Sequence, residues 1–187
     1  VLNVAFIHLL EFMMNIIRFG LLILTALLAI VSHASTQVPF GSEIKTVKNY
    51  NRATTQLATS GSLDEGSVQE LAQRGFKTII DLRTEAEGTA SEKTAVESAG
   101  MTYINIPVTG AGVDADQLAT FINAFEQAAT PVLLHCASGN RAGAMWTTYR
   151  LHKGIAADIA FEEGRTAGMQ PSLEEKIKLT CQANKTC

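Results

Sequence analysis

The sequence predicts an α/β fold built as a three-layer sandwich, in which helices cover both faces of a central parallel sheet. Short apolar runs such as 76–82 (FKTIIDL) and 131–134 (PVLL) indicate strands that are buried on both faces. Between such runs, segments with apolar residues three and four positions apart indicate amphipathic helices. Strands and helices therefore alternate along the chain, which is the pattern of a parallel sheet with right-handed crossovers.

Turn and capping residues set the expected bounds of these elements. Gly75 is expected to end the first helix, and Gly100 and Pro107 lie on either side of the third strand. Strands are expected at 53–59, 76–82, 101–106 and 132–135. Helices are expected from Ser62 or Asp64 to Arg74, from Asp114 or Asp116 to a point before Pro131, and at 90–99, 142–153, 156–166 and 172–180.

The N-terminal segment predicts export from the cytoplasm. The uncharged apolar run 19–31 follows Arg18 and precedes Ser32-His33-Ala34, as in a secretory signal peptide. Its 13 residues are fewer than the about 20 that span a bilayer. We therefore expect a signal peptide at 1–34, a linker at 35–43, one domain at 44–187, and a periplasmic or secreted protein. The alternative is an uncleaved segment that anchors the protein to the membrane.

The charge and the cysteines limit the possible partners. The formal net charge is −3, and no basic stripe is present, so nucleic acid is not an expected partner. In an exported protein, Cys181 and Cys187 are suited to form a local disulfide, the alternative being two free thiols. Cys136 then stands alone, as is expected of a reactive thiol.

The segment from His135 to Gly143 (HCASGNRAG) combines the residues of an anion-binding and nucleophilic loop. It joins an expected strand to an expected helix, and a helix N-terminus favours both bound anions and a thiolate. Cys136 is the candidate nucleophile, and Gly139 allows the backbone turn that directs amide groups inward. Arg141 offers a planar donor pair for phosphate or sulfate, and His135 is expected to help hold the thiolate. An inert core thiol is the alternative, which the glycines and the arginine disfavour.

Three loops are expected to meet around this cysteine. In open α/β sheets, ligands bind beyond the carboxyl ends of the strands. This rule brings together the segments 82–88, 108–116 and 136–141. Asp81 and Arg83, at the end of a neighbouring strand, then orient the loop or contact the substrate, or they form a simple ion pair.

The pattern His-Cys-x-x-Gly-x-Arg resembles the signature of the cysteine-based protein tyrosine and dual-specificity phosphatases. The segments 57–61, 75–83, 103–107 and 135–143, in that order, are similar to a small bacterial phosphatase-like family that is also known from β-lactamase hydrolase-like proteins. The resemblance covers about residues 45–170 and implies the cysteine-phosphatase fold and hydrolysis of a phosphorylated substrate.

The resemblance also implies a mechanism that needs no metal and no other cofactor. Cys136 would attack phosphorus, and Arg141 would stabilise the phosphoryl oxygens. The remaining substrate-binding residues would be His135, Ala137, Ser138, Gly139 and Asn140. Asp114 or Asp116 would be the general acid, because Gly110 occupies the place where many dual-specificity enzymes carry an aspartate. The alternative is that both aspartates only cap a helix. No histidine–cysteine cluster has the spacing of metal ligands.

Two departures from the phosphatase pattern support other functions. Four residues separate Cys136 from Arg141, where tyrosine phosphatases have five, and Ala142 replaces their serine or threonine. The short loop also resembles that of single-domain rhodaneses, which implies a sulfurtransferase with a persulfide on Cys136 as the alternative enzyme. A third possibility is a module that binds oxyanions without turnover.

Overall fold

The computed structural model describes residues 37–39 and 44–184, together with residues 11, 13 and 14. The chain divides into two compact units, Val1–Ser35 and Thr36–Cys187, and all the elements below belong to the second unit. Most of the predicted signal peptide and linker, and also Cys187, lie outside the described residues. The cleavage site of the signal peptide, the cellular location of the protein and the Cys181–Cys187 disulfide therefore stay predictions. Among the described residues, no helix is both long enough and apolar enough to cross a membrane.

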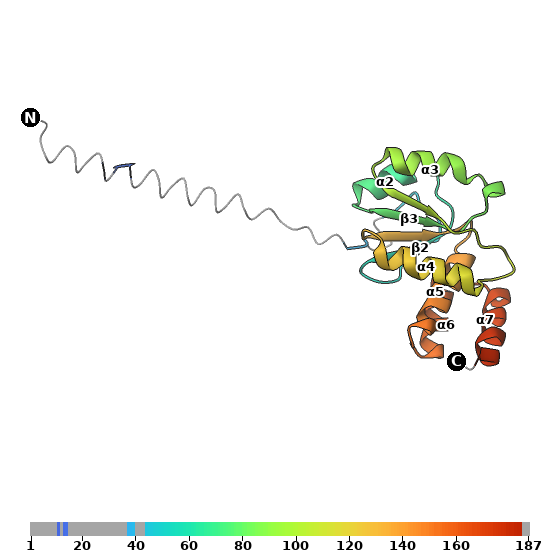
Figure 1. Ribbon diagram of the computed structural model, residues 1–187. Coiled ribbons are helices and arrows are strands. Elements are labelled where there is room, and N and C mark those ends of the chain that lie inside the picture. Colours follow the sequence, from blue (N-terminus) through green and yellow to red (C-terminus); the bar gives the residue numbers. More distant parts are fainter. Residues whose placement is uncertain (1–10, 12, 15–36, 40–43, 185–187) are drawn as a thin grey trace, which may run out of the picture. The chain divides into compact units, whose positions relative to one another are not determined.

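The central sheet has five strands in the described part of the chain (Figure 1). They are β1 (Asn51–Arg52), β2 (Leu57–Ser60), β3 (Thr78–Asp81), β4 (Thr102–Asn105) and β5 (Val132–His135), in the spatial order β1-β2-β5-β3-β4. The four longer strands, β2 to β5, are parallel to one another, which confirms the predicted parallel sheet. The short strand β1 pairs antiparallel with β2 at the edge of the sheet.

The expected strand at 53–59 is therefore shorter than predicted, for a local reason. The Thr54 hydroxyl accepts hydrogen bonds from the amides of Gln56 and Leu57, at 3.1 and 2.9 Å, so residues 53–56 form a tight turn. Only antiparallel strands can be joined by so short a connection, and this turn accounts for the direction of β1.

Helices cover both faces of the sheet (Figure 1). In the described part of the chain they are α2 (Ser67–Gln73), α3 (Thr89–Ser98), α4 (Ala115–Gln127), α5 (Asn140–His152), α6 (Ala157–Thr166) and α7 (Pro171–Asn184), together with the 3-10 helix η2 (Glu85–Glu87). Helices α2 and α3 lie on one face, and α4 and α5 lie on the other, with α6 and α7 beyond α5. Three layers result, as predicted.

Each face of the sheet has its own hydrophobic core, and these two cores explain why the strands are apolar. Successive residues of a strand belong to the two cores in turn, because their side chains point to opposite faces of the sheet. The core on the α4 and α5 side includes Leu57, Ile80, Leu134, Phe121 and Trp146. The core on the α2 and α3 side includes Ala58, Ile79, Leu133, Leu71 and Val96. Because both faces are covered, the strands are apolar at successive positions rather than at every second one.

At the carboxyl edge of the sheet, this alternation continues into polar residues. Ser60 is in register with His135, His135 with Asp81, and Asp81 with Asn105, so these four residues form a row across four strands. Cys136 follows His135 and belongs to the core on the opposite face. The side chains of His135 and Cys136 therefore lie on opposite sides of the sheet.

The backbones of α5 and α6 approach each other closely through two glycines. A Cβ atom on Gly143 would lie 2.5 Å from the carbonyl oxygen of Gly164 and 2.7 Å from the amide nitrogen of Met169. A Cβ atom on Gly164 would overlap the Thr147 hydroxyl. This contact fixes the start of α5, and therefore the loop that precedes it.

Candidate active site

The loop 136–141 joins β5 to α5 and has the turn that the sequence predicts. Gly139 is the N-cap of α5, and its φ of 92° lies in the left-handed region that glycine adopts without strain. Cys136 is a free, buried thiol, and its Sγ accepts a hydrogen bond from the Gly139 amide at 3.2 Å. The sulfur therefore lies beneath the first turn of the helix, where amide groups favour negative charge.

The carbonyl groups of the loop are held on its outer side. The Ala137 carbonyl accepts a hydrogen bond from the Ser62 amide at 3.0 Å, and the Ser138 carbonyl accepts one from Asn49 Nδ2 at 3.0 Å. Since the N–H and C=O of a peptide point in opposite directions, these bonds turn the following amides toward the inside of the loop. Inward amides around a buried sulfur form an anion-binding nest.

Neighbouring segments hold this loop from two sides. Gly61 forms an isolated β-bridge with Ser138, and a Cβ at position 61 would lie 3.1 Å from the Ser138 backbone. On the other side, Asn140 Oδ1 accepts a hydrogen bond from the Gln170 amide at 2.8 Å. The Asn140 side chain thus anchors the start of α7, whereas Ala137 and Ser138 are exposed at the surface of the loop.

Asn49 adopts a conformation that is unusual for a non-glycine residue. Its φ of 49° lies in the left-handed region, which asparagine tolerates better than most residues do. Because its side chain holds the Ser138 carbonyl outward, we expect Asn49→Gly to weaken the binding of inorganic phosphate about tenfold, the loss of one hydrogen bond of about 1.4 kcal/mol. Isothermal titration of wild type and variant checks this. Asn49→Ala adds backbone strain, so a loss confined to Ala would assign the effect to conformation and contradict the prediction.

Arg141 brings the three predicted loops together. Its Nη1 donates to the carbonyl of Val108 at 2.9 Å and to that of Leu82 at 3.5 Å. The same nitrogen donates to Glu87 Oε2 at 2.8 Å, and Nη2 donates to Glu87 Oε1 at 2.6 Å. The predicted meeting of segments 82–88, 108–116 and 136–141 is confirmed by these contacts.

Glu87 itself is fixed by a capping box within η2. Its Oε2 accepts hydrogen bonds from the Thr84 amide at 2.8 Å and the Thr84 hydroxyl at 3.0 Å. The bonds from Arg141 and Thr84 outweigh partial burial and lower the pKa of Glu87 to about 2. Glu87 in turn raises the pKa of Arg141, as does the nearby Cys136 sulfur. The guanidinium is thus held beside the sulfur as a permanent cation.

The lowered pKa of Glu87 predicts how stability depends on pH. A carboxylate with a depressed folded-state pKa stabilises the fold above its ordinary value of 4.5, and this contribution is lost as the pH falls toward about 2. We expect Glu87→Gln to lower the free energy of unfolding by about 1 kcal/mol at pH 7, since a partly exposed pair is screened. The difference should shrink between pH 4.5 and pH 2. Urea denaturation at pH 7, 4 and 3 checks this; a constant difference would contradict it.

The two candidate general acids are helix residues. Asp114 is the N-cap of α4: its Oδ1 accepts a hydrogen bond from the Gln117 amide at 2.8 Å in a capping box. Asp116 is exposed in the first turn of α4. Among the described residues, no hydrogen bond or ion pair joins either aspartate to Cys136 or Arg141. A role of either one as the acid stays a prediction.

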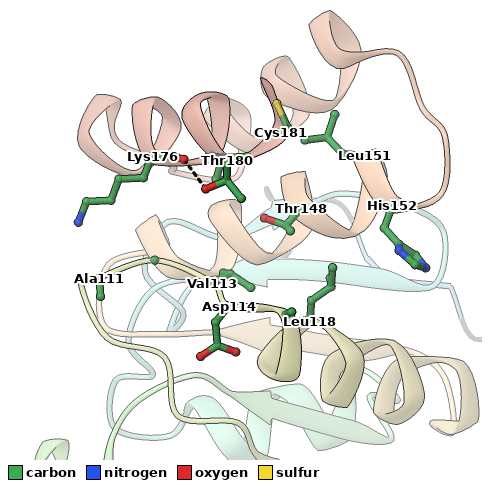
Figure 2. A pocket seen from close by; sticks show the side chains of 13 residues that line it. Ala111, Val113, Asp114, Leu118, Thr148, Leu151, His152, Lys176, Thr180 and Cys181 are labelled. Carbon is green, nitrogen blue, oxygen red and sulfur yellow. Dashed lines mark hydrogen bonds between the residues drawn. The ribbon is translucent and has the colours of Figure 1, made fainter. Parts of the chain in front are cut away.

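Asp114 also borders a pocket of about 340 Å³ (Figure 2). The pocket lies between α4, α5, α7 and the segment that precedes α4. Its lining includes Val113, Leu118, Leu151, Lys176 and Ile177, and no residue of the loop 136–141 takes part. The pocket is therefore distinct from the anion-binding loop.

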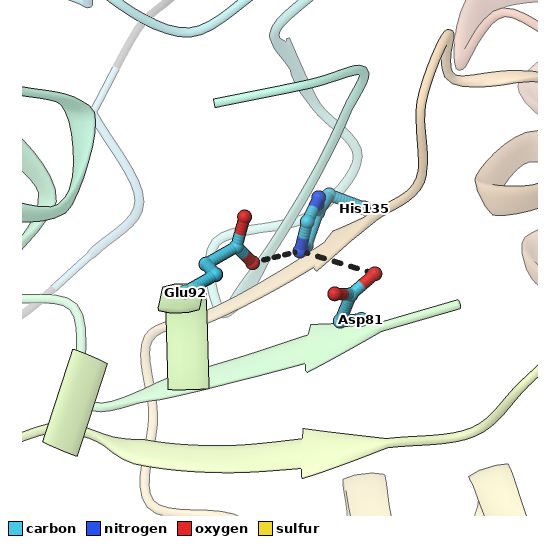
Figure 3. Close-up of side chains that lie close together, drawn as sticks. All are labelled: Asp81, Glu92 and His135. Carbon is cyan, nitrogen blue, oxygen red and sulfur yellow. Dashed lines mark ion pairs between the residues drawn. The ribbon is translucent and has the colours of Figure 1, made fainter. Parts of the chain in front are cut away.

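His135 does not line the loop, contrary to its predicted role as a substrate-binding residue. Its imidazole is buried on the α3 side of the sheet, where Nε2 lies 2.8 Å from Glu92 Oε1 and 3.5 Å from Asp81 Oδ1 (Figure 3). The cause is the strand period: adjacent residues of β5 face opposite sides, and Cys136 occupies the α5 side. A fully buried ring cannot contact substrate directly.

Arg83 and Tyr103 complete this polar cluster. Arg83 Nη2 donates to Asp81 Oδ2 at 2.7 Å and to Glu92 Oε2 at 2.6 Å, and the Tyr103 hydroxyl donates to Asp81 Oδ2 at 2.8 Å. Burial opposes the charge on Asp81, but the hydrogen bonds from Arg83 and Tyr103 and the neighbouring His135 outweigh it and lower the pKa of Asp81. The predicted pair of Asp81 and Arg83 is confirmed as an ion pair.

Comparison with known proteins places this arrangement in a family. The family model for the phosphatase-like domain of β-lactamase hydrolase-like proteins matches residues 49–151, which are more than half of the chain. The chain belongs to this family. The match begins at Asn49, which holds the loop, and ends at the last turn of α5, so it includes Cys136, Arg141 and Glu87.

Relatives and solved structures agree with this family. A β-lactamase hydrolase-like protein from Xylella fastidiosa is 34% identical over 92 residues, which cover 46% of this chain and 21% of that protein. The chain thus matches about a fifth of the length of its curated relatives. The crystal structure of a candidate phosphatase from Neisseria meningitidis is 28% identical with a TM-score of 0.60, and the match covers 70% of this chain and 94% of that one.

A more distant structure shows the same fold. TpbA from P. aeruginosa, solved in complex with pTyr, is 20% identical with a TM-score of 0.55, and the match covers 78% of this chain and 88% of that one. The predicted cysteine-phosphatase fold is thereby confirmed. The matching family model describes a phosphatase-like domain.

Proposed function

We propose that this domain hydrolyses phosphotyrosine-like or small phosphomonoesters through a cysteinyl-phosphate intermediate on Cys136. The observation that carries the proposal is the clamp on Arg141: Glu87 and the Val108 carbonyl hold its guanidinium beside the Cys136 sulfur, over a loop whose carbonyls are bound on the outer side. A phosphoryl group needs such an arrangement, because its transition state carries charge on three equatorial oxygens.

The reaction proceeds in two displacements. In the first, the Cys136 thiolate forms an S–P bond as the P–O bond to the leaving group breaks, and the leaving oxygen takes a proton from solvent. In the second, water forms a new P–O bond and gives up a proton to solvent, the S–P bond breaks, and the thiolate returns as inorganic phosphate leaves. The inward amides and Arg141 stabilise the equatorial oxygens in both steps.

The helix-capping role of Asp114 favours aryl esters as substrates. Its carboxylate already accepts the Gln117 amide, and Asp116 is exposed to solvent. A phenol leaves more easily than an alkyl alcohol when no strong general acid is in place, because a phenol such as tyrosine has a pKa of only about 10. The pTyr complex of the structural neighbour TpbA is consistent with such a substrate.

Hydrolysis of a generic aryl phosphate by wild type and by Cys136→Ser tests the proposal. We expect turnover by wild type and a loss of at least about 10³-fold in the variant, because the nucleophile is removed. Acid quenching followed by mass spectrometry should find phosphate on the peptide that contains Cys136. Equal rates for the two proteins would contradict the proposal.

A sulfurtransferase is the second candidate, and the surroundings of Cys136 favour it. Ala142 is buried directly behind the loop and offers no hydroxyl group to assist the thiolate as it leaves. In sulfur transfer the acceptor bonds to the outer sulfur of the persulfide as the S–S bond breaks, so the Cys136 thiolate leaves from sulfur and not from phosphorus. Thiocyanate production from thiosulfate and cyanide, with the mass of Cys136 after thiosulfate treatment, separates the two enzymes. Binding of phosphate without either reaction would indicate an oxyanion-binding module.

We also propose that the domain acts outside the cytoplasm, on the basis of the apolar run 19–31 and the residues that flank it. A fusion of residues 1–43 to a reporter enzyme that is active only after export tests this. An inactive fusion would contradict it, and a fusion that stays membrane-bound would indicate the uncleaved anchor.

A further inference from the structure

The pocket beside Asp114 is a further place where the protein can hold a small molecule. Its volume of about 340 Å³ lies within the range of about 300–1,000 Å³ that is typical of ligand sites. The apolar part of its lining includes Val113, Leu118, Leu151 and Ile177, which come from the segment before α4 and from α4, α5 and α7 (Figure 2). A compact apolar body therefore fits between these elements.

The charges of the lining favour a neutral ligand. Lys176 and Asp114 carry opposite charges, so the lining has no net charge when His152 is neutral. Both groups are also engaged already. Lys176 Nζ donates to the Gly110 carbonyl at 2.7 Å. Asp114 Oδ1 accepts the Gln117 amide at 2.8 Å. Moving a charged group from water into this pocket would cost free energy that no unengaged opposite charge offsets.

Two threonines determine which polar group the ligand needs. The Thr148 hydroxyl donates to the Ala144 carbonyl at 2.9 Å. The Thr180 hydroxyl donates to the Lys176 carbonyl at 3.0 Å (Figure 2). Each hydroxyl has thus used its proton, and its oxygen keeps lone pairs that can accept a hydrogen bond. A neutral ligand matches these oxygens when it carries an O–H donor on an apolar body.

We propose that this pocket binds neutral alcohols and phenols with a compact apolar body. The ligand hydroxyl donates to Thr148 or Thr180, and the apolar body packs against Val113, Leu118 and Leu151. This class includes the phenols that hydrolysis of aryl phosphates releases. The inference goes beyond the proposed function and does not depend on it, because binding in the pocket needs neither Cys136 nor turnover.

The pocket shares a wall, the segment 111–115, with the candidate active site. The wall continues from Val108, whose carbonyl accepts a hydrogen bond from Arg141 at 2.9 Å. Between them, Thr109 and Gly112 form a β-bridge, so the connection is a tight turn. A ligand that stabilises the wall in this position also stabilises the bond from Arg141 to Val108. Occupancy of the pocket should therefore tighten the binding of inorganic phosphate, and phosphate should tighten the binding of the alcohol by the same factor.

Calorimetric titration of the full chain with 1-naphthol tests the proposal. The matched probe is 1-methoxynaphthalene, in which a methyl group replaces the hydroxyl proton, and 1-naphthoate is the charged probe. The variant combines Thr148→Val with Thr180→Val, which removes both acceptors and keeps the side-chain shape. The matched control is Thr120→Val. The Thr120 hydroxyl donates to a carbonyl four positions earlier in its helix, at 2.8 Å, but Thr120 does not line the pocket.

We expect 1-naphthol to bind with a dissociation constant of about 1 mM or lower, and about tenfold more tightly than either other probe. The paired threonine variant should bind it about tenfold more weakly, the loss of one hydrogen bond, whereas Thr120→Val should bind it as wild type does. Amide chemical shifts should change in α5, α7 and the segment 111–115. Saturating 1-naphthol should tighten the binding of inorganic phosphate by about fivefold, the lower end of typical couplings.

Equal binding of 1-naphthol and 1-methoxynaphthalene would overturn the proposal, because the hydroxyl proton would then have no role. Binding that the paired variant leaves unchanged, or tighter binding of 1-naphthoate, would overturn it as well. A phosphate affinity that 1-naphthol does not alter would overturn the coupling through the shared wall. A protein that passes these tests but hydrolyses no phosphoester would contradict the proposed function alone.

Discussion

Replacement of Arg141 by lysine should lower kcat/KM for an aryl phosphate by about 10²- to 10³-fold, the cost of removing one preorganised donor to a transition-state oxyanion. Lysine keeps the positive charge but cannot donate to Glu87 and Val108 at one end and to a phosphoryl group at the other. Binding of inorganic phosphate should weaken as well, since it uses the same donor. Steady-state kinetics and calorimetry measure the two effects.

The matched control is Arg150→Lys, on the same helix. Arg150 also forms a two-point ion pair, with Glu163 at 2.8 and 3.0 Å, but it lies outside the loop 136–141. We expect its replacement to leave kcat/KM within about twofold, as for a surface change remote from the site. Equal losses in the two variants, or a decrease below about threefold in Arg141→Lys, would show that the fork geometry of Arg141 is not needed.

Gly143→Ala should lower the free energy of unfolding by about 3 kcal/mol, the upper part of the range for overpacking a core. The new methyl group would lie 2.5 Å from the Gly164 carbonyl oxygen and 2.7 Å from the Met169 amide nitrogen. Both are backbone atoms, which cannot rotate away as a flexible side chain can. Helices α5 and α6 must therefore separate, or the start of α5 must shift.

Urea denaturation measures this loss, and Gly110→Ala is the control. Gly110 has no atom within 4 Å of an added Cβ, and its φ lies outside the left-handed region. Its replacement should change the free energy of unfolding by less than about 0.5 kcal/mol. If Gly143→Ala were equally harmless, the close approach of α5 and α6 would not determine stability.

The fold was predictable because its signals are local. The strand 132–135 was predicted with its observed bounds, since an apolar run is followed at once by polar residues and glycine. Gly139 was predicted at φ > 0 for a similar reason, because an anion-binding turn before a helix needs it. The antiparallel β1 was missed, because the Thr54 turn that creates it depends on one side-chain hydroxyl.

The partners of the candidate site were harder to predict, because crossovers bring them from distant segments. Glu87 lies 54 positions from Arg141 and Asn49 lies 89 positions from Ser138, and no periodicity joins such pairs. One signal was nevertheless present: Thr84 and Glu87 have the spacing of a capping box, which fixes the glutamate. The position of His135 also follows from the strand period, because its neighbour Cys136 faces the opposite core.

The order of the strands also determines when the loop can form during folding. The strand β5, which leads into Cys136, lies between β2 and β3 but follows both in the chain. A nascent chain that ends before residue 132 therefore has β2 and β3 with an open position between them, and each presents unpaired backbone groups. Such edges attract other strands, so shortened chains should aggregate rather than fold. The nucleophile is thus added together with the strand that closes the sheet, and a partly synthesised chain carries no reactive loop.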